Sequence, residues 1–238
     1  MQFSGKMKTK IVRKGPVFKD FEVSKPRREM FDAHNEQIIK NDKKVTGVFF
    51  GDSITELWNI DAYFKAEGLL INRGISGDTM EYMIKRYDAD VFQLKPEVVI
   101  FLGGTNDIAK NILLGKNYTN IINIVKKLCN EITILFNETP LKKIFWCSIL
   151  PTHSSYSYHK EKKKIISEVN FYIKELSKKY GYVYVDYFSE MIDKKGNLKL
   201  EYSTDGLHPN FNGYQKMAEI LGKSFKNYFS EISLNIGG

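Results

Sequence analysis

The stretch VTGVFFGDS, residues 45–53, decides the fold. It carries four apolar residues and then turns at a glycine, which is typical of a buried parallel strand that ends at a functional edge. The stretch EVVIFLGGTND, residues 97–107, repeats this design with a longer apolar run. Further strands are predicted within 141–151 and 180–188, and a shorter one at 68–74. Five strands that alternate with helical segments indicate a parallel sheet.

The segments between these strands have helical periodicity. In one of them, apolar residues recur at steps of three or four and form a single stripe that would face the sheet: Ile121, Ile124, Val125, Leu128, Ile132 and Leu135. Helices are predicted at 54–65, 79–93, 117–137, 160–179 and 212–229. We therefore expect an α/β fold, a three-layer α/β/α sandwich around a five-stranded parallel sheet. Ligands of such sheets bind at the carboxyl ends of the strands.

The 238 residues fit a single α/β domain. Residues 1–44 are expected to be an amino-terminal extension, in which a helix from Arg27 to Lys40 packs on the domain of residues 45–238. We find no repeat, low-complexity stretch or linker that would divide the chain further.

The net charge of +8 comes from lysines dispersed along the chain, as expected for solvated helix faces and not for a nucleic-acid interface. No apolar stretch approaches the ~18 residues of a membrane span, and the amino terminus lacks the apolar core of about 7–15 residues in a secretory signal. We expect no membrane span and a cytoplasmic location. Cys129 and Cys147 show no metal-ligand spacing, so they are predicted to be buried free thiols.

Four polar motifs carry the chemistry: GDSIT (51–55), NRGISGDT (72–79), GGTND (103–107) and DGLHPN (205–210). The first places a serine at a strand-to-helix turn, and the second places a glycine in a turn. The third holds a glycine-flanked asparagine, and the fourth has an aspartate three residues before a histidine. Together they provide a nucleophile, oxyanion donors, a base and an orienting carboxylate, the parts of a serine esterase.

These blocks, in this order, resemble the SGNH (GDSL-like) hydrolase superfamily, which is named for its Ser, Gly, Asn and His blocks. They match Ser53, Gly74, Asn106 and His208, and Asp205 completes an Asp-x-x-His arrangement. The resemblance spans residues 47 to about 225. It implies a flavodoxin-like fold and a triad of Ser53, Asp205 and His208. It also implies an oxyanion hole made by the backbone N–H groups of Ser53 and Gly74 and the side-chain amide of Asn106.

Other residues near the motifs are expected to support the site or to border it. Asp52 is expected to point away from Ser53 and to support the loop, while Ser53 and Glu56 also fit a helix capping box. Candidate substrate contacts at the rim are Arg73 and His153. Asp78, Thr79 and Asp107 are expected to hold turns. His34 and His159 are expected to lie on the surface.

No cofactor or metal is expected. The glycine-rich motifs match neither G-x-x-x-x-G-K-[ST] nor G-x-G-x-x-G, and the four histidines are not paired at metal-ligand spacing. The expected partner is a small-molecule ester, and the sequence does not define an oligomeric state.

The predicted activity is hydrolysis of carboxylic esters through an acyl-Ser53 intermediate. GDSITELW, NRGISGDT and KPEVVIFLGGTNDI resemble the branch with platelet-activating-factor acetylhydrolase-like proteins, lysophospholipase-like enzymes and sugar acetylesterases. Short acyl groups, acetyl above all, are expected because the loops between motifs are short and polar and no long hydrophobic lid is evident. Two alternatives stay open: an O-acyltransferase or sugar acetylesterase with the same triad, and a catalytically idle binding protein.

Overall fold

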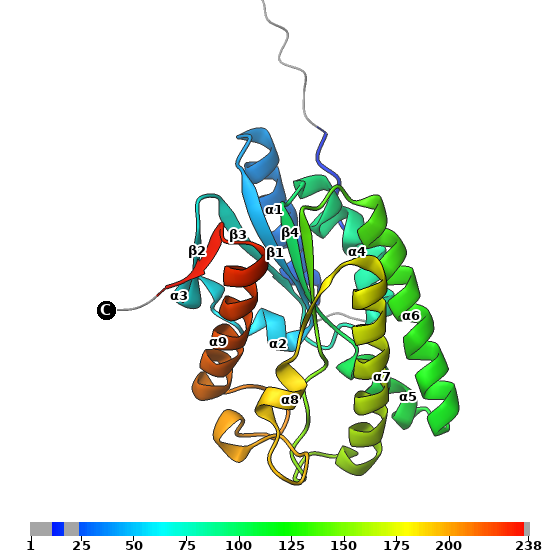
Figure 1. The fold of residues 1–238 in the computed structure, drawn as a ribbon. Coiled ribbons are helices and arrows are strands. Elements are labelled where there is room, and N and C mark those ends of the chain that lie inside the picture. Colours follow the sequence, from blue (N-terminus) through cyan, green and yellow to red (C-terminus); the bar gives the residue numbers. More distant parts are fainter. Residues whose placement is uncertain (1–10, 17–23, 236–238) are drawn as a thin grey trace, which may run out of the picture.

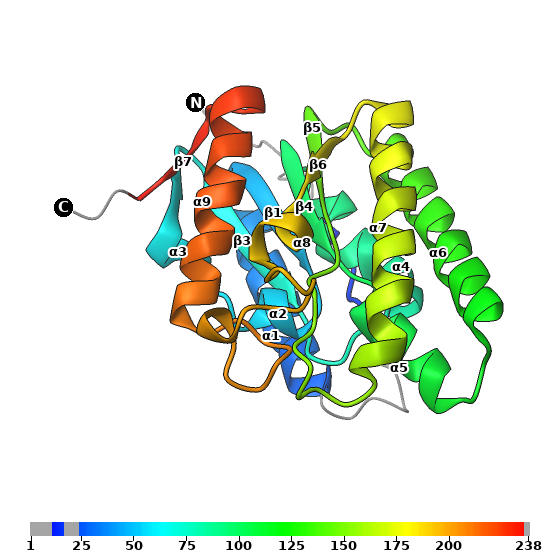
Figure 2. The same cartoon turned by 60° about the horizontal axis from the view of Figure 1, so that its bottom comes forward.

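A computed structural model of the protein describes residues 11–16 and 24–235. Within these residues, five strands form one parallel sheet in the order β3-β1-β4-β5-β6 (Figures 1 and 2). Their bounds are β1 (Val45–Gly51), β3 (Leu69–Gly74), β4 (Val98–Leu102), β5 (Lys143–Cys147) and β6 (Val183–Val185). The predicted α/β fold with a five-stranded parallel sheet is confirmed. Its strand order is that of flavodoxin-like sheets. The chain first adds β3 on one side of β1 and then adds β4, β5 and β6 on the other side, so the order of addition reverses between β1 and β4 while all strands stay parallel.

Helices cover both faces of the sheet, as Figures 1 and 2 show from two sides. One face carries α1 (Ser24–Lys40), α4 (Met80–Asp90), α6 (Tyr118–Glu138) and α7 (His159–Tyr180); the other carries α9 (Phe211–Tyr228) with the short α2 (Ser53–Glu56), α3 (Ile60–Tyr63) and α8 (Tyr187–Met191). Alternate strand residues supply the two cores: Val48 and Phe50 pack on the first face, and Phe49 packs on the second. Because both faces are covered, β4 is apolar without interruption and β1 is buried along its whole length.

The helices predicted at 117–137, 160–179 and 212–229 agree with α6, α7 and α9 to within one residue at each end. The helix predicted at 79–93 is α4 followed by a 3₁₀ turn, η1 (Phe92–Leu94). Helices α5 (Thr105–Leu113) and α8 and the 3₁₀ turn η2 (Leu200–Tyr202) were not predicted.

The single helix predicted at 54–65 was wrong. The chain there forms α2, α3 and a strand, β2 (Phe64–Ala66), which pairs antiparallel with the carboxyl-terminal β7 (Ile232–Leu234). Phe64 explains the change, because its buried ring packs on Trp58 and on Phe225 of α9, with centroids 5.6 Å and 5.5 Å apart. A continuous helix would lose this pairing with a distant part of the chain.

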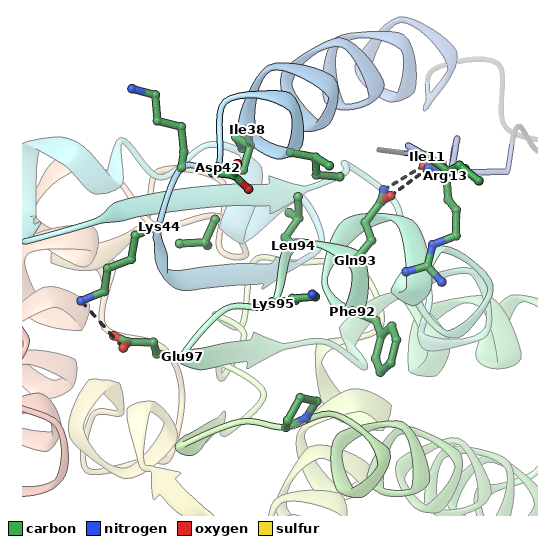
Figure 3. A pocket seen from close by; sticks show the side chains of 14 residues that line it. Ile11, Arg13, Ile38, Asp42, Lys44, Phe92, Gln93, Leu94, Lys95 and Glu97 are labelled. Carbon is green, nitrogen blue, oxygen red and sulfur yellow. Dashed lines mark hydrogen bonds and ion pairs between the residues drawn. The ribbon is translucent and has the colours of Figure 1, made fainter. Parts of the chain in front are cut away.

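The expected extension, residues 1–44, lies partly outside the described residues. Its helix α1 begins at Ser24, three residues before the predicted start. Near it, Arg13 N–H donates to Gln93 Oε1, and Gln93 Nε2 donates back to the Arg13 carbonyl, both at 2.8 Å (Figure 3). These residues border a cavity of about 800 Å³ that also contacts Val45 and Glu97, at the amino ends of β1 and β4. Within the described residues, no helix has the length and apolar character needed to cross a membrane.

Candidate active site

Ser53 lies where β1 ends and α2 begins. The strand stops at Gly51, and Asp52 is the helix N-cap, with its Oδ1 accepting the Ile54 N–H at 3.0 Å. Ser53 is therefore the first residue of α2, where a backbone N–H has no acceptor inside the helix. The alternative of a capping box formed by Ser53 was wrong, because Asp52 caps the helix and the Glu56 carboxylate accepts the Ser76 N–H instead.

The structure brings His208 and Asp205 to this serine. The Ser53 hydroxyl lies 3.0 Å from His208 Nε2, and His208 Nδ1 lies 2.6 Å from Asp205 Oδ2. Both side chains stand in the loop that leads into α9, at the same edge of the sheet as the end of β1. The serine is 8% exposed and His208 is partly exposed, so the three groups form a continuous chain that opens to solvent.

The loop holds Asp205 in a fixed orientation. Asp205 Oδ1 accepts the N–H groups of Leu207 and His208, both at 2.8 Å, and the Ser203 hydroxyl donates to the same oxygen at 3.1 Å. Gly206 has φ of 83°, a left-handed turn that brings these N–H groups around the carboxylate. The other carboxylate oxygen is thereby directed to the imidazole.

Partial burial raises the pKa of Asp205, but hydrogen bonds from the His208 side chain and from the N–H groups of Leu207 and His208 outweigh it. The net result is a pKa well below the ordinary value of an aspartate. Asp205 is therefore a carboxylate at neutral pH, and His208 Nδ1–H donates to it. This arrangement leaves Nε2 as an acceptor for the Ser53 hydroxyl.

Helix α9 is fixed against α2 by two aromatic side chains. The Tyr214 hydroxyl donates to the Ile54 carbonyl at 2.9 Å, and the Tyr214 ring stacks on Trp58 with centroids 5.7 Å apart. Because Ile54 follows the serine and Tyr214 follows the histidine loop, these contacts set the distance between the two. The sequence analysis did not single out Tyr214.

Asn106 is the second residue of α5, which begins directly after β4. One hydrogen of its side-chain amide is donated to the Asp78 carbonyl at 2.9 Å, which fixes the amide and leaves its second hydrogen for another acceptor. The Asp107 carboxylate accepts the Met80 N–H, with both oxygens at 3.0–3.1 Å. Asp78 and Asp107 thus hold the loop before α4 against the start of α5.

The expectation that the Gly74 backbone N–H is an oxyanion donor does not fit the structure. Its N–H donates to Asn72 Oδ1 at 2.9 Å, so this donor is already occupied. A Cβ at Gly74 would lie 2.1 Å from the Glu56 backbone nitrogen, which shows that the glycine is needed for close packing of β3 on α2.

The backbone N–H of Gly77 is the better candidate for an oxyanion donor. It is exposed and has φ of 77°, and within the described part of the chain its N–H makes no hydrogen bond. The next residue, Asp78, holds the Asn106 amide through its carbonyl, so the two donors are neighbours. The sequence alone does not choose between Gly74 and Gly77, because both lie in NRGISGDT, and the structure shows that only the second follows the end of β3.

Residues 49–216 match the family of GDSL-like lipases and acylhydrolases. The chain belongs to this family. The resemblance noted in the sequence is therefore confirmed.

Proteins similar to this chain include two curated relatives and a solved structure of a GDSL-like lipase. An acetylxylan esterase of Xylanibacter ruminicola is 28% identical over 206 residues, which cover 74% of this chain and 42% of the relative. An N-acylneuraminate cytidylyltransferase of Escherichia coli is 27% identical over 176 residues, covering 72% of this chain and 39% of that protein. The chain thus spans about two fifths of the length of each relative. A GDSL-like lipase from Bacteroides thetaiotaomicron has a TM-score of 0.64 and 25% identity, with 84% of this chain and 97% of that one covered.

Three buried acidic groups, Asp52, Asp78 and Asp107, adjoin the candidate site residues in the sequence. Burial raises the pKa of Asp52 to about 7, against a hydrogen bond from Ile54, and burial raises the pKa of Asp107 to about 7 as well. Asp78 is paired with Arg86, whose Nε donates to Asp78 Oδ2 at 2.6 Å. Asp52 is 1% exposed and its Oδ1 accepts the Ile54 N–H, so it caps α2.

The remaining candidates lie in three different settings. Arg73 is 1% exposed and donates to Asn35 Oδ1 beneath α1, so its expected place at the rim was wrong. His153 is partly exposed, and its N–H donates to the Gly206 carbonyl at 2.8 Å, beside the Asp205 loop. His34 is exposed, but His159 is buried between Thr152 and Asn197, so its expected surface position was wrong. Within the described residues, no group of three His, Cys, Asp or Glu side chains could hold a metal.

Proposed function

We propose that this chain hydrolyses short-chain carboxylic esters, acetyl esters above all, with Ser53 as the nucleophile. The observation that carries the proposal is the continuous hydrogen-bonded chain of Ser53 Oγ, His208 and Asp205, with steps of 3.0 Å and 2.6 Å. A serine hydroxyl is a weak nucleophile at neutral pH and needs a base at this distance.

In this proposal His208 Nε2 takes the proton of Ser53 as the hydroxyl attacks the ester carbonyl. Asp205 holds the imidazole in the tautomer that accepts this proton and stabilises the imidazolium that forms. The imidazolium then protonates the leaving alcohol, and a water molecule activated by the same histidine releases the acid from the acyl-enzyme.

The negative charge of the tetrahedral intermediate needs donors, and three candidates line the same edge of the sheet. They are the backbone N–H groups of Ser53 and Gly77 and the free amide hydrogen of Asn106. Such donors together supply a large part of esterase catalysis, and loss of one typically lowers turnover about 100- to 1,000-fold.

Short acyl groups fit the short connections at this edge. Asp52 is the one residue between β1 and α2, and Gly103 and Gly104 are the residues between β4 and α5. These connections offer little material for a deep acyl channel over Ser53. The similarity to an acetylxylan esterase points in the same direction.

A second cavity, of about 730 Å³, lies beside the Asp205 loop and suits a hydroxyl-rich leaving group. His153 borders it together with charged residues of both signs: Asp193, Lys194, Lys199 and Glu201. We propose that His153 contacts the leaving group there. Replacing His153 with alanine should raise KM for an acetylated xylo-oligosaccharide and leave KM for p-nitrophenyl acetate within about 2-fold.

The decisive test measures hydrolysis of p-nitrophenyl acetate, butyrate and octanoate by the purified protein and by Ser53→Ala. A fluorophosphonate label located by mass spectrometry identifies the nucleophile. Three results together support the proposal: turnover falls with acyl-chain length, turnover is lost in Ser53→Ala, and the label is found on Ser53. A wild-type protein that neither turns over these esters nor takes the label would favour a binding protein, and product formation that depends on an added alcohol would favour an acyltransferase.

A further inference from the structure

Lys162 is a buried lysine behind the candidate active site, and the ester chemistry described above gives it no role. It lies in the first turns of α7 and is 1% exposed, whereas Lys160 and Lys164 on the same helix are exposed. Lysine is almost never fully buried unless its ammonium is paired, because desolvation of the charge costs several kcal/mol. Its partners therefore indicate what the burial achieves.

The ammonium joins α7 to the start of α5. Lys162 Nζ donates to Thr105 Oγ1 at 2.9 Å, and it lies 5.0 Å from the centroid of the Tyr156 ring. Thr105 is the first residue of α5 and is itself buried, and the next residue is Asn106. The lysine therefore bonds to the residue that precedes the candidate oxyanion donor.

The charge of Lys162 also acts electrostatically on Asp52, the residue that precedes the nucleophile. Asp52 Oδ2 is buried and finds no hydrogen-bond partner among the described residues. Burial lowers the pKa of Lys162 to about 8, and the charge of Asp52 opposes this shift. Burial likewise raises the pKa of Asp52, and the charge of Lys162 opposes that shift. Each charge thus stabilises the other.

We propose that Lys162 is a positioning residue for the ester hydrolysis proposed above. Its hydrogen bond to Thr105 holds the start of α5, and its charge acts on the buried Asp52 carboxylate after the end of β1, so that the Asn106 amide is fixed relative to Ser53. Lys162 does not touch the substrate in this arrangement, so its effect passes through these two neighbours.

The expected signature follows from where the oxyanion forms. Asn106 contacts the developing charge of the transition state more strongly than the neutral carbonyl of the bound ester, so a displaced amide lowers kcat with little effect on KM. A misplacement of about 1 Å can cost about 100-fold in rate. We expect Lys162→Met to lower kcat for p-nitrophenyl acetate about 10- to 100-fold, with KM within about 2-fold of the wild-type value.

The test compares Lys162→Met, Thr105→Val and their double variant, with Lys160→Met as a control of matched chemistry on the same helix. Lys160→Met should be unchanged. Thr105→Val removes the acceptor hydroxyl and should lose part of the same rate, and the double variant should be no slower than Lys162→Met alone. Fully additive losses would overturn the proposal, because the two residues would then act independently.

A second double variant, Asp52→Asn with Lys162→Met, removes both buried charges and separates loss of folding from loss of positioning. If Lys162 serves the active site, kcat of this double variant stays at least 10-fold below that of Asp52→Asn alone, while its melting temperature rises from that of Lys162→Met back to the wild-type value. If kcat returns to the level of Asp52→Asn, Lys162 merely neutralises Asp52 and the proposal is overturned. Failure of the proposed function itself is distinct, since wild-type protein would then neither hydrolyse p-nitrophenyl acetate nor label at Ser53.

Discussion

Replacing Asp205 with asparagine tests the orientation of the imidazole, because the loop dictates how the new amide must sit. Two backbone N–H groups, those of Leu207 and His208, donate to Asp205 Oδ1 at 2.8 Å, and an oxygen must stay there to accept them. The amide NH₂ then replaces Oδ2, 2.6 Å from His208 Nδ1. A donor in this place forces Nδ1 to accept, so the ring proton moves to Nε2, where the Ser53 hydroxyl needs an acceptor.

The size of the loss follows from exposure. In a fully buried serine-protease triad the same substitution lowers kcat about 10⁴-fold. Here the side chains of Asp205 and His208 are 52% and 32% exposed, so water can support the other tautomer in part of the population. We therefore expect kcat/KM for p-nitrophenyl acetate to fall about 10²- to 10³-fold, or about 3–4 kcal/mol of transition-state stabilisation.

The assay measures kcat/KM of Asp205→Asn, Ser53→Ala and a matched control, Asp186→Asn, together with their melting temperatures. Asp186 caps α8 by accepting the Ser189 N–H at 3.0 Å, and asparagine caps a helix as well as aspartate does. The control should keep wild-type activity. If Asp205→Asn retained more than a third of wild-type kcat/KM while Ser53→Ala was inactive, the carboxylate would not set the tautomer and the reasoning would be refuted.

Three further predictions concern buried groups. Burial raises the pKa of Asp52 from 3.8 to about 7, so the unfolded chain releases a proton that the folded chain keeps, and the free energy of unfolding falls as pH rises through that window. Asp52→Asn should be about 1–2 kcal/mol more stable than wild type at pH 8 and no more stable at pH 4 in urea denaturation; equal gaps at both pH values would contradict this. Gly74→Ala should lower the free energy of unfolding by about 3 kcal/mol because its Cβ would clash with the Glu56 nitrogen, and an unchanged melting temperature would exclude that packing. Arg86→Met leaves the buried Asp78 carboxylate without its arginine and removes one of the two arginine partners of Asp90, so it should cost about 3–5 kcal/mol by urea denaturation; a loss below about 1 kcal/mol would show that Asp78 is neutral.

The sequence predicted the parts of the site whose geometry is local or follows from a parallel sheet. Ser53 and Asn106 each follow an apolar strand, and parallel strands place their carboxyl ends at one edge. Asp205 and His208 are three residues apart, so one turn is enough to bring their side chains together. None of these relations requires knowledge of distant packing.

Whether Gly74 or Gly77 supplies the candidate oxyanion donor depends on information that the sequence does not contain. Both glycines lie in one motif, but the Asn72 side chain turns back to accept the Gly74 N–H. The donor that stays open belongs to Gly77, which follows the strand end in a left-handed turn. Which N–H is free is a property of side-chain orientation, and a motif records only the order of residue types.

Residues 54–65 were predicted as a helix for a related reason. The stretch ITELWNIDAYFKAE has a helix-like distribution of apolar residues, and local periodicity indicates no strand there. Residues 64–66 become β2 because β7, from the other end of the chain, pairs with them. Tertiary pairing overrides local preference in such short segments.

The buried charges that connect α1 to the active-site edge have no signature in the sequence, yet they explain why a helix outside the family match packs so closely. Arg28 of α1 pairs with Asp90 Oδ1 at 2.5 Å, and Arg86 donates to Asp90 Oδ2 at 2.8 Å. Arg86 also donates to Asp78 at 2.6 Å and to the carbonyl of Gly51 at 2.9 Å, where the strand before the nucleophile ends. Because each charged side chain in this network is buried, removal of one leaves the charge of its neighbours uncompensated. The contribution of α1 is therefore to complete a network that holds the end of β1 and the loop before α4, the two segments that carry the nucleophile and a candidate oxyanion donor.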